Sequence, residues 1–185
     1  GNPGIRPEIN NQVDLNIRRK TDRSIIEITG FASYLQDYIS SAIDPDLAPR
    51  LPMSPGVRKY LNLDEAFTSG VEIYWKQTLI AGLQHNFTAA YTYGQDLDNA
   101  QPLPEIAPLD FRYRITGNYL RNKLNPEVSL RYVMKQNRIA ASYGESVTPS
   151  FILVDTKISY NLLKIIKIAG GVNNILDAAY YEHLS

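Results

Sequence analysis

The chain has 185 residues, enough for one domain, and its 19 basic and 19 acidic residues cancel, so no excess of positive charge points to a nucleic-acid partner. Cysteine is absent, which excludes disulfides, thiolate metal sites and cysteine nucleophiles. No apolar run reaches the length of about 18 residues that a transmembrane helix needs.

Period-two alternation of apolar and polar residues is the dominant signal along the chain. In the clearest segment Phe111, Tyr113 and Ile115 alternate with Arg112 and Arg114. Such alternation is typical of half-buried β-strands, and no comparable helical stripe is present. In chain order the predicted strands cover residues 9–19, 23–39, 67–79, 84–95, 110–121, 126–140, 150–161 and 164–174. The sequence therefore predicts an all-β, antiparallel fold.

Short and long connections alternate strictly between these strands. The short ones are 20–22, 80–83, 122–125 and 162–163, and the long ones are 40–66, 95–109 and 141–149. Short turns at one end and long loops at the other are typical of bacterial outer-membrane β-barrels. A soluble β-sandwich stays open as an alternative, although it gives no reason for all long loops to lie at one end.

Aromatic residues gather near the expected strand ends, and the chain holds 13 tyrosines against 5 phenylalanines. The long-loop end carries Phe67, Phe111, Phe151, Tyr38 and Tyr93, and the short-turn end carries Tyr119 and Tyr160. We interpret them as two interfacial girdles on either side of an apolar band. The general preference of tyrosine for strands explains some of these positions equally well.

Charged residues occupy the face opposite the apolar band. An Arg or Lys side chain that faces lipid at mid-membrane costs about 2–4 kcal/mol, so a water-filled lumen is the expected surrounding. The expected lumen-facing residues are Arg112, Arg114, Arg131, Lys135, Asp155 and Lys157. A solvated face of an ordinary sheet is the alternative.

The number of strands suggests that the barrel is incomplete within these residues. With short turns on the periplasmic side, the first strand runs down and the eighth runs up, so both chain ends fall on the extracellular side. Complete barrels of this class have an even strand number, with both termini normally on the periplasmic side. We therefore expect at least one further strand before Gly1 and one after Ser185.

Four segments resemble motifs of the TonB-dependent receptors of the outer membrane, and together they cover nearly the whole chain. The segment from Asn2 to Glu8 is similar to an "NP-x-L-x-PE" strand opening, and Gly70-Val71-Glu72 to a "GVE" opening. Pro102-Leu103-Pro104 resembles a "PLP" loop. The segment from Gly171 to Leu184 is close to "GVxNLFDxxYxEHL", with Ile175-Leu176 in place of Leu-Phe.

The resemblance implies a barrel of about twenty-two strands whose lumen is filled by an N-terminal plug domain. Residues 1–185 then form a single C-terminal portion of that barrel, roughly strands fourteen to twenty-one, without the plug, the TonB box and the last strand. The resemblance also implies the outer membrane of a Gram-negative bacterium and uptake of an iron–siderophore or other metal chelate. The implied partners are the TonB complex, outer-membrane lipid and that ligand; no cofactor and no nucleic acid are expected. A passive porin-like channel remains the alternative if no plug is present.

Loop residues above the lumen are the expected ligand-binding residues, because loops in barrels of this kind carry specificity. They are Arg50, Met53, Arg58, Asp96, Asp98, Glu105, Arg138 and Glu145. Arg50 and Arg58 suit an anionic chelate, whereas simple solubility of the loops is the alternative for each residue. His85 is expected to lie at the membrane interface, and His183 is expected to be structural or loop-exposed. Neither histidine is expected to bind a metal. No serine has nucleophile-elbow glycines around it, so no enzyme activity is expected.

Overall fold

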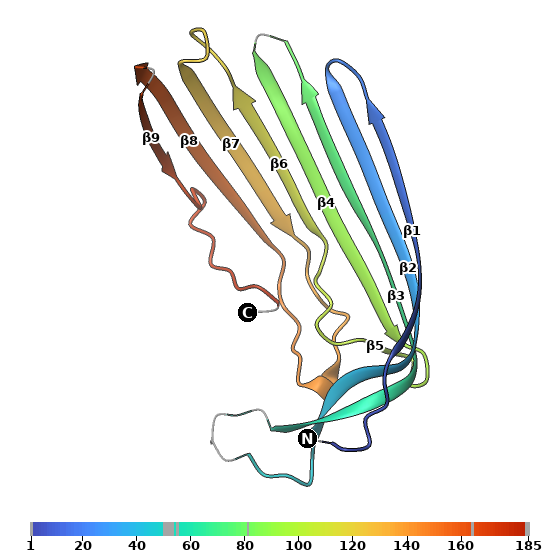
Figure 1. Ribbon diagram of the computed structural model, residues 1–185. Helices are drawn as coiled ribbons and strands as arrows, with labels where there is room; N and C mark the ends of the chain where they lie inside the picture. Colours follow the sequence, from blue (N-terminus) through green and yellow to red (C-terminus); the bar gives the residue numbers. More distant parts are fainter. Residues whose placement is uncertain (1, 50–53, 55, 81, 164, 184–185) are drawn as a thin grey trace.

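The computed structural model describes residues 2–49, 54, 56–80, 82–163 and 165–183, and it contains one antiparallel sheet (Figure 1). Neighbouring strands follow the order β1-β2-β3-β4-β6-β7-β8-β9, and the short β5 pairs with β4 outside that path. The elements are β1 Ile9–Lys20, β2 Ser24–Asp44, β3 Val57–Thr78, β4 Leu83–Asp96, β5 Gln101–Pro102, β6 Asp110–Gly117, β7 Leu124–Val133, the 3-10 turn η1 Ala141–Tyr143, β8 Phe151–Leu163 and β9 Ile166–Val172. Within these residues the sheet is not closed, and β1 and β9 are its edges. No helix in the described part of the chain is long and apolar enough to span a membrane.

All the strands that the sequence predicts are present, but several ends are wrong. β2 continues to Asp44 and pairs with β3 as far back as Val57, inside the segment predicted as loop 40–66. The prolines of this segment fall at positions 45, 49, 52 and 55, beyond the strand ends, so they remove no donor from the ladder. The β2–β3 hairpin therefore extends past its neighbours at the long-loop end (Figure 1).

β6 and β7 are shorter than predicted. Leu120, Arg121 and Asn122 all have positive φ angles of 52°, 56° and 68°, so the turn that follows β6 begins before residue 121. β7 ends at Val133 and not at 140, because the next residues pair with loops. Met134 donates its N–H to Leu109, and Gln136 forms an isolated bridge with Thr148.

The register confirms that the sheet has one apolar and one charged face. Residues that lie opposite each other in an antiparallel pair share a face. Phe111 lies opposite Tyr132, which lies opposite Ile152, whereas Arg112 lies opposite Arg131. The apolar face is exposed, with 73% of Val13 and 53% of Ile158 accessible, as a lipid-facing surface requires.

Three positions depart from the expected faces. Phe151 lies opposite Val133, on the face of Arg131, and its ring packs on Tyr180 at a centroid distance of 4.7 Å. It is therefore not part of an interfacial girdle. Tyr38 is not in the girdle either: Asp37, with a φ of 53°, interrupts the ladder, and Tyr38 packs against the buried cluster of the long-loop end. Lys135 is exposed beyond the end of β7.

A small apolar cluster fixes the long loops on the sheet. It consists of Leu35, Ala66 and Leu103, with Ile106 among the residues packed against it. Gly94 on β4 makes this contact possible, because a Cβ atom there would lie 2.7 Å from Ile106 Cδ1. The loop between β4 and β6 is thereby held close to the backbone of β4, which positions the candidate site.

Candidate functional site

Four separate segments meet at the long-loop end of the sheet. They are the start of β3, the loop between β4 and β6, the loop that contains η1, and the segment that follows β9. Their side chains border a cavity of about 630 Å³, which we call the loop cavity. Its lining residues are Arg58, Glu105, Tyr143, Gly144, Glu145, Ser146 and His183.

Tyr143 connects two of the residues that the sequence proposed for ligand binding. The Arg58 guanidinium lies over its ring, 3.6 Å from the centroid. Its hydroxyl donates a hydrogen bond of 2.6 Å to Glu105 Oε1. This hydrogen bond to Glu105, together with burial, raises the pKa of Tyr143, and the positive charge of Arg58 acts in the opposite direction. Tyr143 ends η1, and Gly144 follows it with a φ of 91°, a conformation that favours glycine.

Glu145 joins the two loops through its carboxylate. Oε1 accepts the N–H of Glu105 at 2.6 Å, and Oε2 accepts the N–H of Ala140 at 2.8 Å. His183 approaches the same carboxylate from the last segment, with Nε2 3.8 Å from Glu145 Oε1. The His183 side chain is only 2% exposed, so the structure places it inside the loops and not on their surface.

The other predicted loop residues make contacts that hold the loops themselves. Arg138 donates to Gln95 Oε1 at 2.8 Å, and its guanidinium lies 4.2 Å from the centre of the Tyr93 ring. Asp96 is buried and accepts the N–H groups of Asp98 and Asn99, which closes the turn after β4. Arg50 and Met53 lie outside the described residues.

Asp98 binds β3, because its carboxylate accepts the N–H of Glu65 at 2.9 Å. Asp96, Asp98 and Tyr143 also border a second cavity of about 530 Å³ between the β2–β3 hairpin and the loops. The sequence-predicted residues thus form two groups: Arg58, Glu105 and Glu145 at the loop cavity, and the two aspartates in the turn after β4.

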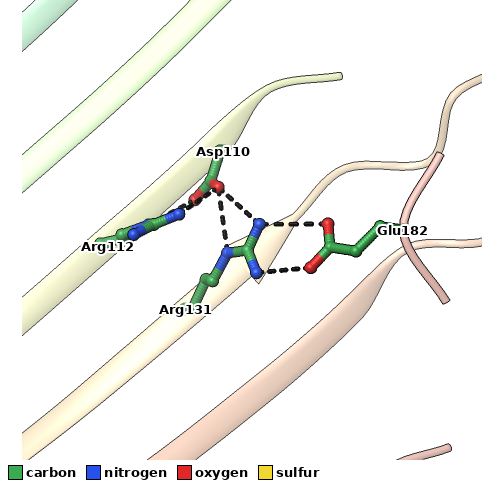
Figure 2. Close-up of polar contacts among 4 residues, drawn as sticks. All are labelled: Asp110, Arg112, Arg131 and Glu182. Carbon is green, nitrogen blue, oxygen red and sulfur yellow. Dashed lines mark hydrogen bonds and ion pairs between the residues drawn. The ribbon is translucent and has the colours of Figure 1, made fainter. Parts of the chain in front are cut away.

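The charged face of the sheet carries a connected network directly below the loops. Arg131 on β7 is bound by Asp110 on β6 and by both carboxylate oxygens of Glu182, at 2.6 and 3.2 Å (Figure 2). Arg112 binds the same Asp110 at 2.9 Å. The segment after β9 is therefore attached to the charged face of the sheet immediately before it reaches the loop cavity.

The remaining wall residues also face this side. Arg114 pairs with Glu127 at 3.5 Å, and Lys157 lies opposite Glu127 in the ladder. Asp155 accepts the N–H of Asn174 at 2.7 Å, a second attachment point for the last segment. Within the described residues, no group of three or more His, Cys, Asp or Glu side chains is placed to hold one metal ion.

Sequence reasoning missed Tyr143, Asp110 and Glu182. Asp110 precedes Arg112 by two residues on the same strand face, so its pairing with an arginine is readable from the alternation. Glu182 lies 51 residues from Arg131, and nothing in the local pattern of either segment indicates that contact.

The family model described as "TonB dependent receptor-like, beta-barrel" matches residues 1–175. A curated relative is the iron-regulated outer membrane virulence protein of Vibrio cholerae, 24% identical over 96% of this chain. This chain spans only 28% of that protein's length.

Solved structures of receptors superpose closely on the sheet. The copper transporter OprC has a TM-score of 0.86 and 25% identity, over 97% of this chain and 27% of its own. The ferric yersiniabactin uptake receptor FyuA of Yersinia pestis has a TM-score of 0.69 and 14% identity, over 94% of this chain and 26% of its own.

The structural matches agree with the antiparallel sheet of this chain. TonB-dependent receptors are transporters and not enzymes, and they lie in the outer membrane of Gram-negative bacteria. The chain belongs to the TonB-dependent receptor family and forms part of an outer-membrane β-barrel.

Proposed function

We propose that this chain is the C-terminal portion of the barrel of a receptor that imports a metal chelate, with an iron–siderophore complex as the leading substrate. Import is energised through TonB, which acts on the plug domain of the full receptor. The loop cavity is the observation that supports this proposal most directly. Four segments border a half-open cavity of about 630 Å³ at the long-loop end of the charged face, with an aromatic ring, a guanidinium and two carboxylates on its surface.

Arg58 is the residue of this cavity best placed to contact an anionic chelate. Among the described residues its guanidinium contacts the Tyr143 ring but makes no ion pair, so its N–H donors are available to a ligand. Glu105 and Glu145 accept hydrogen bonds from the loops and so hold the shape of the cavity. The relatives named above support a metal-containing substrate: one is iron-regulated, one takes up a ferric siderophore and one transports copper.

The wall below the cavity supports passage of a polar solute. Arg112, Arg131 and Asp155 lie on one face of the sheet, where a charged complex finds polar contacts instead of apolar surface. Because these side chains pair with carboxylates or backbone groups, none of them leaves an isolated charge in the barrel.

Growth under metal limitation tests the proposal. A strain that lacks the receptor gene is supplied with single iron–siderophore complexes, copper or haem as the scarce source, and uptake of the radiolabelled metal is measured. We expect one chelate to require the full-length receptor, and its uptake to stop when TonB is deleted or the proton gradient is collapsed. Uptake that persists without TonB would instead indicate a passive channel.

A substitution of Arg58 tests whether the loop cavity binds the transported ligand. Arg58→Ala is expected to raise the substrate concentration that gives half-maximal uptake by about 10-fold, the effect of losing one charge-assisted contact. Arg23→Ala is the matched control, because Arg23 lies in the turn between β1 and β2, at the opposite end of the sheet. An unchanged half-maximal concentration for Arg58→Ala would place ligand binding elsewhere in the loops.

A further inference from the structure

His183 has an unused nitrogen inside the loop cavity. Its side chain is only 2% exposed and lines the cavity, yet Nε2 has no hydrogen-bond partner among the described residues. An unpaired buried polar atom is costly, on the order of 1–3 kcal/mol, and calls for an explanation. A bound ligand is one such explanation, because His183 is one of the residues that line the cavity.

The other nitrogen of the ring is occupied in a way that suits metal binding. Nδ1 lies 3.4 Å from the hydroxyl oxygen of Thr148, which accepts a hydrogen bond when Nδ1 carries the proton. In this tautomer Nε2 carries the free lone pair, 3.8 Å from Glu145 Oε1. Histidines that bind metals in proteins are usually held in this manner, with the second ring N–H bound to an oxygen acceptor.

Glu145 provides a second ligand at a suitable distance. Its Oε1 lies 3.8 Å from Nε2. Metal–nitrogen and metal–oxygen bonds are about 2.0–2.2 Å long, so two of them together exceed this separation and one ion can touch both atoms. Both oxygens of Glu145 already accept one backbone N–H each, which orients the carboxylate and leaves further lone pairs for a metal.

The charges around the cavity favour a cation. The lining holds two carboxylates, Glu105 and Glu145, and one guanidinium, so a cation is favoured beside Glu145 while Arg58 remains available to the anionic part of a chelate. The position of His183 is also fixed from behind, because its neighbour Glu182 is bound to Arg131 through both carboxylate oxygens (Figure 2). The backbone that carries His183 is therefore held in place beside the cavity.

We propose that His183 Nε2 and Glu145 Oε1 form a two-ligand site for a divalent transition metal ion such as Cu²⁺, with the remaining coordination positions left to water or to a chelator. An imidazole with a carboxylate suits copper, zinc and nickel better than calcium or magnesium. The site departs from the sequence-based expectation that neither histidine binds metal. It rests on the proposed function, since it specifies what the receptor holds in the loop cavity. Two protein ligands bind weakly enough to release the metal onward, as transport requires.

Copper binding to the purified full-length receptor tests this site without any transport step. Cu²⁺ alone is titrated into the receptor in detergent, and binding is followed by calorimetry and by the nitrogen hyperfine pattern in the electron paramagnetic resonance spectrum. We expect His183→Gln to lose one bound Cu²⁺ with its nitrogen signal, and Glu145→Gln to weaken that site at least about 10-fold. His85→Gln is the matched control, because His85 is the other histidine of this chain and lies on β4 at the short-turn end.

A milder variant separates binding from folding. Thr148→Val keeps the shape of the side chain but cannot accept from Nδ1, and loss of such an outer contact is expected to weaken Cu²⁺ binding about 10–100-fold. Equal copper stoichiometry in the wild type and in His183→Gln overturns the proposal, and so does unchanged affinity in Glu145→Gln. Failure of the wild type to support metal uptake in cells, with copper binding intact, would instead contradict the proposed function and leave this site standing.

Discussion

Glu182 binds Arg131 with both of its carboxylate oxygens, and through this pair the segment after β9 is fixed to the charged face of β7 (Figure 2). Arg131 also binds Asp110 and therefore has two partners in this network. Arg112 has one partner in it, Asp110. Arg131 is 26% exposed and Arg112 is 60% exposed, so the two arginines differ in how much their contacts are screened by water.

Arg131→Ala is therefore expected to destabilise the barrel more than Arg112→Ala. Loss of the charged hydrogen bonds of Arg131 should lower the free energy of unfolding by about 1.5–3 kcal/mol, against less than about 1 kcal/mol for the exposed Arg112. Denaturant unfolding in lipid vesicles measures both. A double-mutant cycle with Glu182→Gln should give a coupling energy above about 0.5 kcal/mol, and a value near zero would show that the pair is not formed.

Gly94→Ala is expected to disturb the long loops. The added Cβ would lie 2.7 Å from Ile106 Cδ1 and 3.1 Å from Leu103 Cβ, and overpacking of this kind costs about 1–3 kcal/mol. Gly170→Ala is the control, because nothing lies within 4 Å of its added Cβ. Unfolding midpoints and protease cleavage of the loops report the two effects. Equal stability of the two variants would mean that the loop is not packed on β4.

The phenol of Tyr143 is expected to titrate above the usual tyrosine range of about 10. Its pKa is raised by the hydrogen bond to Glu105, so the hydrogen bond stabilises the loops below pH 10 and is lost as the pH rises through the raised value. The absorbance difference at about 295 nm between the wild type and Tyr143→Phe isolates this group. Glu105→Gln should move the transition to lower pH and Arg58→Ala to higher pH, because the two neighbours act in opposite directions.

The two faces of the sheet can be distinguished by one charge placed on either side of β2. Ile28 lies opposite Ile17 and Ile73 on the apolar face, and Thr29 lies opposite Asn16 and Glu72 on the polar face. Ile28→Lys is expected to cost about 2–4 kcal/mol in lipid vesicles, and Thr29→Lys less than about 1 kcal/mol. The reverse order of the two unfolding free energies would exchange the lipid and lumen faces.

The sequence was sufficient for the strands and their faces because both depend on a local signal. Alternation in Phe111–Arg112–Tyr113–Arg114 fixes which side each residue faces, whatever the neighbouring strand does. Strand ends depend on backbone conformation that side chains reveal poorly. The sequence predicts a turn from Asn122, a residue type that tolerates positive φ, but Leu120 and Arg121 also adopt positive φ and neither residue type indicates this earlier start.

The candidate site was only partly readable for a related reason. Arg58, Glu105 and Glu145 were named as loop residues, but their convergence depends on contacts between segments far apart in sequence, such as the one from Tyr143 to Glu105. His183 was expected to be structural or loop-exposed, since nothing in its own motif shows that it is enclosed by the loop of Glu145.

The length of the β2–β3 hairpin has a practical consequence for detecting the receptor on living cells. Because the paired strands continue to Asp44 and Val57, this hairpin extends farther than the neighbouring loops (Figure 1), and Leu47, just beyond the last pair, is 49% accessible. A short epitope inserted after Leu47 lies beyond the last pair of the ladder, Asp44 with Val57, at an exposed loop position where insertions are tolerated. Antibodies against that epitope should label intact cells, which reports surface expression of each variant independently of its activity.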